Sequence, residues 1–358
     1  MTNKHFPHFF LAANSAGGFY SAFNKNYSIT DWNAYIIKGG PGTGKSGVMK
    51  KFLKVASDLK KQVVLCPCSS DPKSLDAVIL PEDKIIILDG TAPHVVEPTL
   101  PGVCEQIINT GSFWSRKILL KNKNNIIKAA ADNKFLHKRA AEYIKAAGQL
   151  LSYNFNLQLK STNIDKAISY GAKLAERYIK KTDGTAQEWV RFLGGITPEG
   201  YVFYDRTVDI LANEKVIICD ELGAVASVIF SGVRDYALNC GHEIITVKNP
   251  ILPNDIIDAI IVPKLKLAFC RQSSFSNITA NSRKIHTRRF LINQELNTCR
   301  EKIKFNNKAA YTLIDAAVKT LKDAKNAHDV LEAFYIEAMD FKALEEYSQN
   351  IIENIFNT

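Results

Sequence analysis

The chain has 358 residues, of which 46% are hydrophobic and 23% are charged. These values are typical of a folded globular protein and exclude a collagen-like, fibrous or largely disordered one. The length favours two or three domains. Because no run approaches the roughly 20 apolar residues that span a bilayer, we expect no membrane insertion.

The N-terminal residues and the cysteines indicate the cellular compartment of the protein. Residues 1–10 lack the apolar stretch and the small-residue cleavage site of a secretory signal. The seven cysteines are an odd number, scattered along the chain, and form no disulfide framework. Cys66-Pro67-Cys68 lacks the second ligand pair of a zinc site, so we interpret it as packing at a strand end. The sequence predicts a reducing, cytoplasmic location.

The first predicted site follows the apolar strand Tyr35–Ile37. The next residues, Gly39-Gly40-Pro41-Gly42-Thr43-Gly44-Lys45-Ser46-Gly47, contain the pattern G-x-x-x-x-G-K-S, and a helix is predicted through about Lys60. The glycines let backbone N–H groups point at phosphate oxygens, and the helix N-terminus adds partial positive charge. We expect Lys45 to reach the β- and γ-phosphates and Ser46 to ligate Mg²⁺. The segment 39–47 is therefore predicted to be a nucleotide-binding phosphate loop (Walker A).

A second apolar strand, Ile85–Leu88, ends in Asp89. We expect Asp89 to hold the Mg²⁺ through a water molecule and, with Lys45, to be catalytic. Gly90 follows, where many ATPases have a glutamate as catalytic base. The displaced candidates for polarising water, each of which we interpret as a loop-capping residue, are Asp71, Asp76, His94 and Glu97.

The segment 116–181 is strongly basic and has helical periodicity. It holds 15 Lys or Arg against 4 Asp or Glu, whereas the whole chain carries a net charge of +10. Such a face could meet nucleic acid or an acidic protein partner, although basic helices are more often only solvated. We therefore treat 116–181 as a possible partner surface.

The chain repeats itself at a spacing of 182 residues. The clearest match places Leu75–Pro81 on Ile257–Pro263, with Asp, Ala and Pro in register. Each copy has short apolar strands followed by a long helical stretch. The expected segments are a nucleotide-binding domain (1–115), a basic helical segment (116–183), a second, related domain (184–282) and a C-terminal helical segment (283–358), with the hinge between the copies at 181–187.

The second copy lacks the phosphate ligands of the first. At the same spacing the loop becomes Glu221–Val228, without a lysine, and Asp89 becomes Arg271. We expect this copy to bind no nucleotide and to be a scaffold or regulatory half. One hypothesis makes Arg271 an arginine finger for the first copy, and an ordinary surface or ion-paired arginine is the alternative. The same hypothesis extends to the cluster Arg283, Lys284, Arg288 and Arg289.

These motifs resemble the phosphate-loop NTPase superfamily and, more closely, a group of uncharacterised bacterial ATPase-like proteins with a duplicated phosphate-loop domain. The resemblance rests on the loop 36–46, on Cys68–Asp76 and on Asp89–His94, and it spans nearly the whole chain. In that family the second loop is often intact, and here it is degenerate. The resemblance implies ATP binding.

The sequence thus predicts an α/β protein with two tandem three-layer, phosphate-loop-like domains, each with a mostly parallel sheet and a following helical segment. ATP is favoured over GTP because the guanine-reading Asn-Lys-x-Asp motif does not occur. The expected function is that of a Mg²⁺-dependent ATPase, a nucleoside-triphosphate hydrolase. The alternatives are a nucleotide or small-molecule kinase and a nucleotide-gated nucleic-acid-binding protein.

Overall fold

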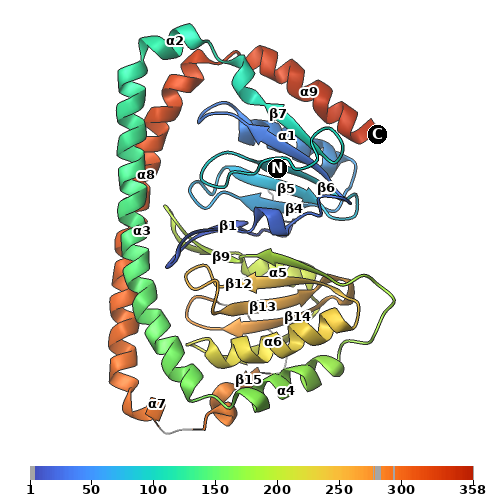
Figure 1. The fold of residues 1–358 in the computed structure, drawn as a ribbon. Helices are drawn as coiled ribbons and strands as arrows, with labels where there is room; N and C mark the ends of the chain where they lie inside the picture. The colour runs from blue at the N-terminus through green and yellow to red at the C-terminus, as the bar shows by residue number, and fades with distance from the viewer. Residues whose placement is uncertain (1–4, 277, 279–283, 293–294, 358) are drawn as a thin grey trace. The chain divides into compact units, whose positions relative to one another are not determined.

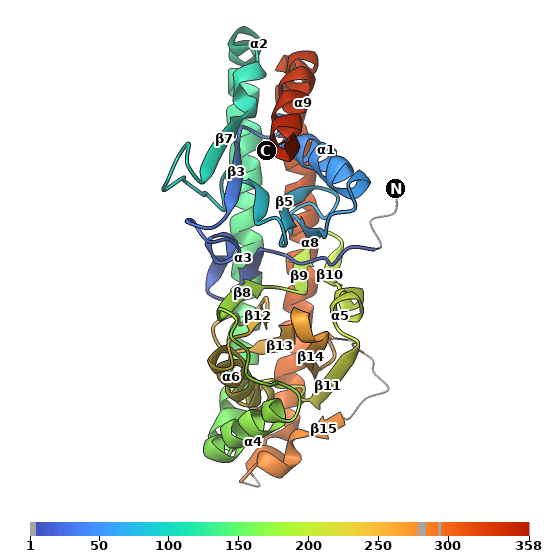
Figure 2. The ribbon, with the colours of Figure 1, turned by 90° about the vertical axis from the view of Figure 1, so that its right-hand side faces the viewer.

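The chain folds as a mixed α/β protein, seen in a computed structural model (Figures 1 and 2). The structure describes residues 5–276, 278, 284–292 and 295–357. The chain forms two compact units, which we name after a glycine in a loop of each. The Gly39 unit comprises Tyr27–Ala140, Thr197–Glu199 and Val318–Thr358, and the Gly223 unit comprises Met1–Asn26, Ala141–Ile196 and Gly200–Ala317.

The Gly39 unit contains a five-stranded sheet in the order β4-β5-β6-β3-β7. Its strands are β3 (Asn33–Lys38), β4 (Val64–Pro67), β5 (Leu75–Leu80), β6 (Ile85–Asp89) and β7 (Glu105–Asn109). Strands β6, β3 and β7 are parallel, whereas β5 is antiparallel to both of its neighbours. The sheet is mixed, and four of its five strands run in the same direction, which agrees with the predicted mostly parallel sheet.

Helix α1 (Lys45–Asp58) packs on this sheet through one apolar face. Its buried residues recur at helical spacing: Val48, Met49, Phe52, Leu53 and Ala56. The last helix, α9 (Phe341–Asn357), lies beside α1 (Figure 1), and Phe52 stacks on Phe356 with ring centroids 5.0 Å apart. The other helices here are η2 (Thr110–Phe113), α2 (Arg116–Lys121), and parts of α3 (Lys123–Lys160) and α8 (Arg300–Ala338), which also contribute to the Gly223 unit.

The Gly223 unit contains a six-stranded sheet in the order β15-β11-β14-β13-β12-β8. The strands of this unit are β1 (Ala12–Ser15), β2 (Gly18–Ser21), β8 (Gln187–Arg191), β9 (Gly194–Thr197), β10 (Gly200–Phe203), β11 (Glu214–Cys219), β12 (Glu243–Lys248), β13 (Ile257–Val262), β14 (Leu267–Gln272) and β15 (Lys284–His286). Its further helices are η1 (Phe23–Lys25), α4 (Ile164–Glu176), α5 (Asp205–Leu211), α6 (Ala224–Asn239), η3 (Pro263–Leu265), η4 (Thr287–Phe290) and α7 (Glu295–Thr298).

Five strands of each unit follow the same plan. The order β12-β13-β14-β11-β15 reproduces β4-β5-β6-β3-β7, and in each set only the second strand is antiparallel to its neighbours. Two short hairpins also correspond: Gly18 and Gly200 each open the second strand of a hairpin at positive φ, 101° and 117°. A left-handed backbone of this kind favours glycine.

The compact units do not follow the expected linear segments. Residues 1–26, which the sequence placed with the first nucleotide-binding domain, belong to the Gly223 unit. Phe10 and Phe192 exchange two backbone hydrogen bonds of 2.8 and 3.0 Å, and both are fully buried. The residues 181–187, expected as the hinge, also lie within the Gly223 unit. Long-range backbone pairing, invisible in the sequence, decides both assignments.

The structure also bears on the state of the cysteines and on membrane insertion. All seven cysteines are free thiols. Over the residues that the structure describes, no helix has the length and apolar character required to cross a bilayer.

In the Gly223 unit, α4 and α6 cross at very short range, which gives a test of the fold. A Cβ added to Gly171 would lie 2.1 Å from the carbonyl oxygen of Ile229. We expect Gly171→Ala to lower the free energy of unfolding by about 1–3 kcal/mol, because the helices must separate. Urea denaturation measures the change, and Ser169→Ala, on the exposed side of α4, is the control. A Gly171→Ala protein as stable as this control would contradict the packing.

Candidate functional site

The predicted phosphate loop lies between a buried strand and a helix. Strand β3 ends at Lys38, and α1 begins at Lys45. Gly44 is the N-cap of α1 in the left-handed conformation, with φ 81°, and Gly42 has φ 65°. Because the first N–H groups of a helix have no intrahelical acceptor, the amides at Lys45 and Ser46 are free of the helix's own bonding. The loop thus has the strand-loop-helix setting that an anion site needs.

The start of the loop is packed too tightly for a side chain. A Cβ on Gly39 would lie 2.1 Å from Thr110 Oγ1 and 2.6 Å from Thr43 Oγ1. The Thr43 hydroxyl donates to the Gly40 carbonyl at 2.8 Å and lies 2.9 Å from the Thr110 hydroxyl. These bonds hold the loop in a tight turn at the carboxyl end of β3. By contrast, a Cβ on Gly47 would meet nothing within 4 Å among the described residues.

The side chains of Lys45 and Asp89 lie close together beside the loop 39–47. The Lys45 Nζ donates to the Gly40 carbonyl at 2.7 Å and lies 3.7 Å from Asp89 Oδ2. Strand β6 carries Asp89 at its carboxyl end, directly opposite Ile37 of β3. The other carboxylate oxygen, Oδ1, accepts hydrogen bonds from the N–H and hydroxyl of Thr91. One oxygen of Asp89 is thereby fixed, and the other faces the lysine.

The side chains at this loop have the charge and the oxygen ligands that a nucleoside triphosphate with Mg²⁺ requires. Lys45 and the helix amides provide positive charge for phosphate, and Ser46 and Asp89 provide hard oxygen ligands. The Ser46 Oγ accepts from the Leu75 N–H at 3.2 Å, which orients the hydroxyl. No group of three metal-ligating side chains occurs among the described residues. Mg²⁺ does not require one, because it usually keeps several waters and takes its other oxygens from phosphates.

Of the four candidates for polarising water, Glu97 and Asp71 have partners of their own, whereas Asp76 and His94 lie together. Glu97 pairs with Lys38 at 2.5 Å, and Asp71 accepts from the Ser74 hydroxyl at 2.8 Å. Asp76 and His94 are brought together instead, with Oδ1 and Nε2 3.6 Å apart and both side chains buried. Burial lowers the pKa of His94, but the attraction of the nearby Asp76 and Asp89 carboxylates outweighs it and raises the pKa.

Cys68, which is partly exposed, interacts with Asp76 as well. Burial raises the pKa of its thiol well above the usual value, and the charge of Asp76 adds to the effect. A thiol with a raised pKa is a poor nucleophile and a poor metal ligand. Cys66, two residues earlier, is fully buried in β4. Both observations agree with the prediction that the Cys-x-Cys segment packs at a strand end.

Sequence reasoning missed one part of the site, the C-terminal helices. A Cβ on Gly40 would lie 3.1 Å from the Tyr335 ring and 3.2 Å from the Trp114 ring. The two aromatic rings meet edge to face, with centroids 5.8 Å apart. The end of α8 therefore contacts the loop, although nearly 300 residues of chain separate them. No local pattern around Tyr335 signals this contact.

The corresponding loop of the Gly223 unit has the same backbone plan and different chemistry. Gly223 is the left-handed N-cap of α6, with φ 87°. The amide of Ala224 donates to Gln158 Oε1 at 2.8 Å, and that of Ala226 donates to Asp220 Oδ2 at 2.8 Å. Gln158 and Asp220 also bond to each other at 2.7 Å. The helix amides that would meet a phosphate are thus occupied by buried side chains of the unit itself.

Arg271 is bound inside its own unit. Its side chain is buried and donates to Asp258 Oδ1 from Nε and Nη2, at 2.8 and 2.6 Å. Nη1 donates to the carbonyls of Asp220 and Glu221, at 3.0 and 3.3 Å. Burial lowers the pKa of the guanidinium, but Asp258 outweighs it and raises the pKa. The arginine-finger hypothesis for Arg271 is therefore disfavoured, because the cation is desolvated and fully paired.

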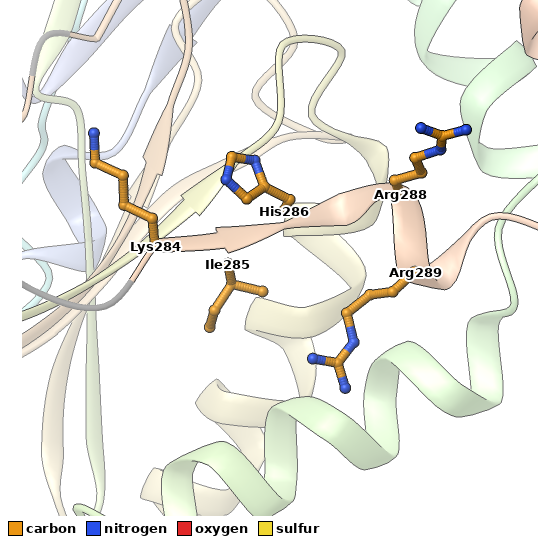
Figure 3. Close-up of a pocket in the computed structure, with 5 residues that line it drawn as sticks. All are labelled: Lys284, Ile285, His286, Arg288 and Arg289. Carbon is orange, nitrogen blue, oxygen red and sulfur yellow. The ribbon is translucent and has the colours of Figure 1, made fainter.

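The rest of the proposed cation cluster lines a shallow depression in the Gly223 unit. Arg283 lies outside the described residues. Lys284, His286, Arg288 and Arg289 surround an open volume of about 510 Å³ (Figure 3). The guanidinium of Arg289 extends toward α4 and lies 4.8 Å from the centroid of the Tyr170 ring. This contact assigns Arg289 a packing role within its unit.

Comparison with protein-family models, curated proteins and solved structures finds no match to this chain. The functional argument therefore depends on the geometry of the loop and its neighbours.

The Asp76–His94 pair predicts a pH-dependent contribution to stability. Since the folded-state pKa of His94 is raised, the stabilisation is fully present below the unfolded pKa of 6.5 and is lost as pH rises through the folded pKa. We expect the stability difference between the native protein and His94→Gln to shrink from about pH 6 to about pH 9, by about 1.4 kcal/mol for each unit of pKa difference. Urea denaturation at both pH values measures it, with exposed His286→Gln as control. A difference independent of pH would contradict the pairing.

The buried Arg271–Asp258 pair predicts a structural phenotype. Arg271→Met leaves the Asp258 carboxylate buried without its cation and should lower the free energy of unfolding by about 3–5 kcal/mol. Adding Asp258→Asn should recover part of this loss. The control is Arg234→Met, which breaks a partly exposed pair with Glu188 and should cost about 1 kcal/mol or less. Equal effects of Arg271→Met and Arg234→Met on the urea midpoint would refute the assignment.

Proposed function

We propose that the Gly39 unit binds ATP and Mg²⁺ at the loop 39–47 and hydrolyses ATP. The observation that carries this proposal is the position of Lys45, which opens α1 and lies 3.7 Å from Asp89 at the end of the adjacent parallel strand. This arrangement supports the proposal, because a cation suited to phosphate and a carboxylate suited to Mg²⁺ lie at the same edge of the sheet. Lys45 and Asp89 would be the catalytic residues, with Ser46 as the direct Mg²⁺ ligand.

In this proposal, the bound Mg²⁺ would neutralise charge on the transferring phosphoryl group, and the chain's own residues would position it. The loop amides hold the phosphates, Lys45 offsets their charge, and Thr91 fixes the orientation of Asp89. The charge of Asp89 also acts on the buried Asp76–His94 pair and contributes to the raised pKa of His94. ATP is preferred over GTP on the sequence argument alone.

We further propose that the two units are copies of one phosphate-loop-like domain and that the Gly223 copy binds no nucleotide. The shared order and direction of five strands supports the duplication. Gln158 and Asp220, which occupy the helix amides of the Gly223 loop, support the loss of binding. A regulatory role for this copy and a protein or nucleic-acid partner at 116–181 remain predictions, as does the cytoplasmic location.

The central test is binding of a fluorescent ATP analogue with Mg²⁺, with ADP release followed in the same samples. Lys45→Ala should weaken binding by at least about tenfold, because a charge-assisted contact to phosphate is lost. The matched control is Lys50→Ala, an exposed lysine on the same helix, which should bind as the native protein does. Equal affinities of the Lys45→Ala and Lys50→Ala proteins, or no binding by the native protein, would refute the proposal.

The same measurement separates the ATPase from the alternatives. Slow ADP release without any added acceptor indicates a hydrolase. ADP release that requires an added nucleotide or small molecule indicates a kinase. The kinase remains the second candidate because Gly90 follows Asp89 where an ATPase commonly has a glutamate as base.

A further inference from the structure

The loop of the Gly39 unit is in direct contact with the junction between α8 and α9, which we call the C-terminal corner (residues 332–344). A Cβ on Gly42 would lie 2.7 Å from the carbonyl oxygen of Glu332. A Cβ on Gly44 would lie 2.8 Å from Leu344 Cδ2. Glycine is therefore needed at these two positions for two reasons. It adopts the positive φ of the loop, and its lack of a Cβ leaves space for the residues of the C-terminal corner.

A carboxylate of the corner occupies a loop amide. Glu332 Oε1 accepts a hydrogen bond from the Gly42 N–H at 3.1 Å. The hydrogen bond from His328 lowers the pKa of Glu332, and the His328 charge, the Gly42 bond and Lys325 act in the same direction against burial. Glu332 is therefore ionised at neutral pH. An anion of the chain itself is bonded to the loop whose amides suit phosphate.

We propose that Glu332 sets the nucleotide affinity of this site by competing with phosphate for the Gly42 amide. The inference rests on the proposed function of the loop. Phosphate and carboxylate cannot both accept the same N–H in a direct hydrogen bond, and their negative charges repel. Nucleotide binding must therefore break the Gly42–Glu332 bond, and the bond in turn weakens nucleotide binding. The two events are coupled by one free energy, as linkage requires.

Other contacts hold the corner while Glu332 is displaced. The Ser115 N–H donates to the Ala338 carbonyl at 2.7 Å, and the Asp340 N–H donates to the Phe113 carbonyl at 2.8 Å. On α9, Ser348 accepts from Lys51 of α1 at 3.1 Å. Because these bonds do not involve Glu332, a rotation of its side chain suffices to free the amide. The side chain is one-third exposed, so it has room to turn toward solvent.

The first experiment compares ATP-analogue affinities in Mg²⁺ for the native protein, Glu332→Gln and Glu337→Gln. Glu337 is an exposed residue on the same helix and controls for the loss of one negative charge. Glu332→Gln should bind roughly tenfold more tightly than the native protein, within the usual range of such couplings. Glu337→Gln should stay within about twofold, because an exposed charge is screened. Equal affinities of the two variants would overturn the competition.

A second measurement needs no nucleotide and examines the contact itself. Hydrogen exchange of the Gly42 amide in the nucleotide-free protein should be faster in Glu332→Ala than in Glu337→Ala, because the acceptor has been removed. Unchanged exchange would overturn the contact. If exchange rises but neither the native protein nor Glu332→Gln binds nucleotide, the proposed function fails and the competition fails with it. If binding depends on Lys45 but not on Glu332, the competition alone fails.

Discussion

Unpaired amides at the start of a helix are the constraint on which both units depend. In each unit a buried parallel strand leads through a glycine with positive φ into a helix, and the first N–H groups of that helix need an acceptor. The Gly223 unit satisfies them with Gln158 and Asp220. In the Gly39 unit, by contrast, Lys45 opens the helix, and the carboxylate of Glu332 accepts from the Gly42 amide of the preceding loop. The same backbone plan thus has its first helix amides bonded to buried side chains in the Gly223 unit, and preceded by a lysine-containing glycine loop in the Gly39 unit.

A second shared constraint is a buried aspartate near the start of the antiparallel strand. Asp76 of β5 and Asp258 of β13 occupy the same register, and each requires a cation. Asp258 has Arg271, and Asp76 has His94. At the strand position that corresponds to Asp89, the Gly223 unit has Arg271, which supplies the counter-charge for Asp258.

Local patterns of the sequence predicted the strand-loop-helix backbone of the candidate site, and long-range contacts limited the rest. The phosphate loop and the adjacent Asp89 depend on strand, loop and helix within about 60 residues, so periodicity and glycine spacing suffice. The antiparallel β5 was overlooked although the sequence signals it. The connection from Pro67 to Leu75 is shorter than the dozen or so residues that a parallel crossover needs. By contrast, the pairing of Phe10 with Phe192 leaves no local trace.

The contact of Glu332 with Gly42 shows why the missing part of the site matters to its chemistry. A phosphate loop read from sequence alone is an anion receptor with fixed affinity. In the folded unit, a carboxylate of the same chain bonds to a loop amide, and under the proposed competition a nucleotide would have to displace it. Its apparent affinity is then the intrinsic affinity reduced by the population of the competing contact. Under the proposed competition, any partner that moves the end of α8 would change that population, and the site would respond to events at the C-terminal helices with no change in a loop residue.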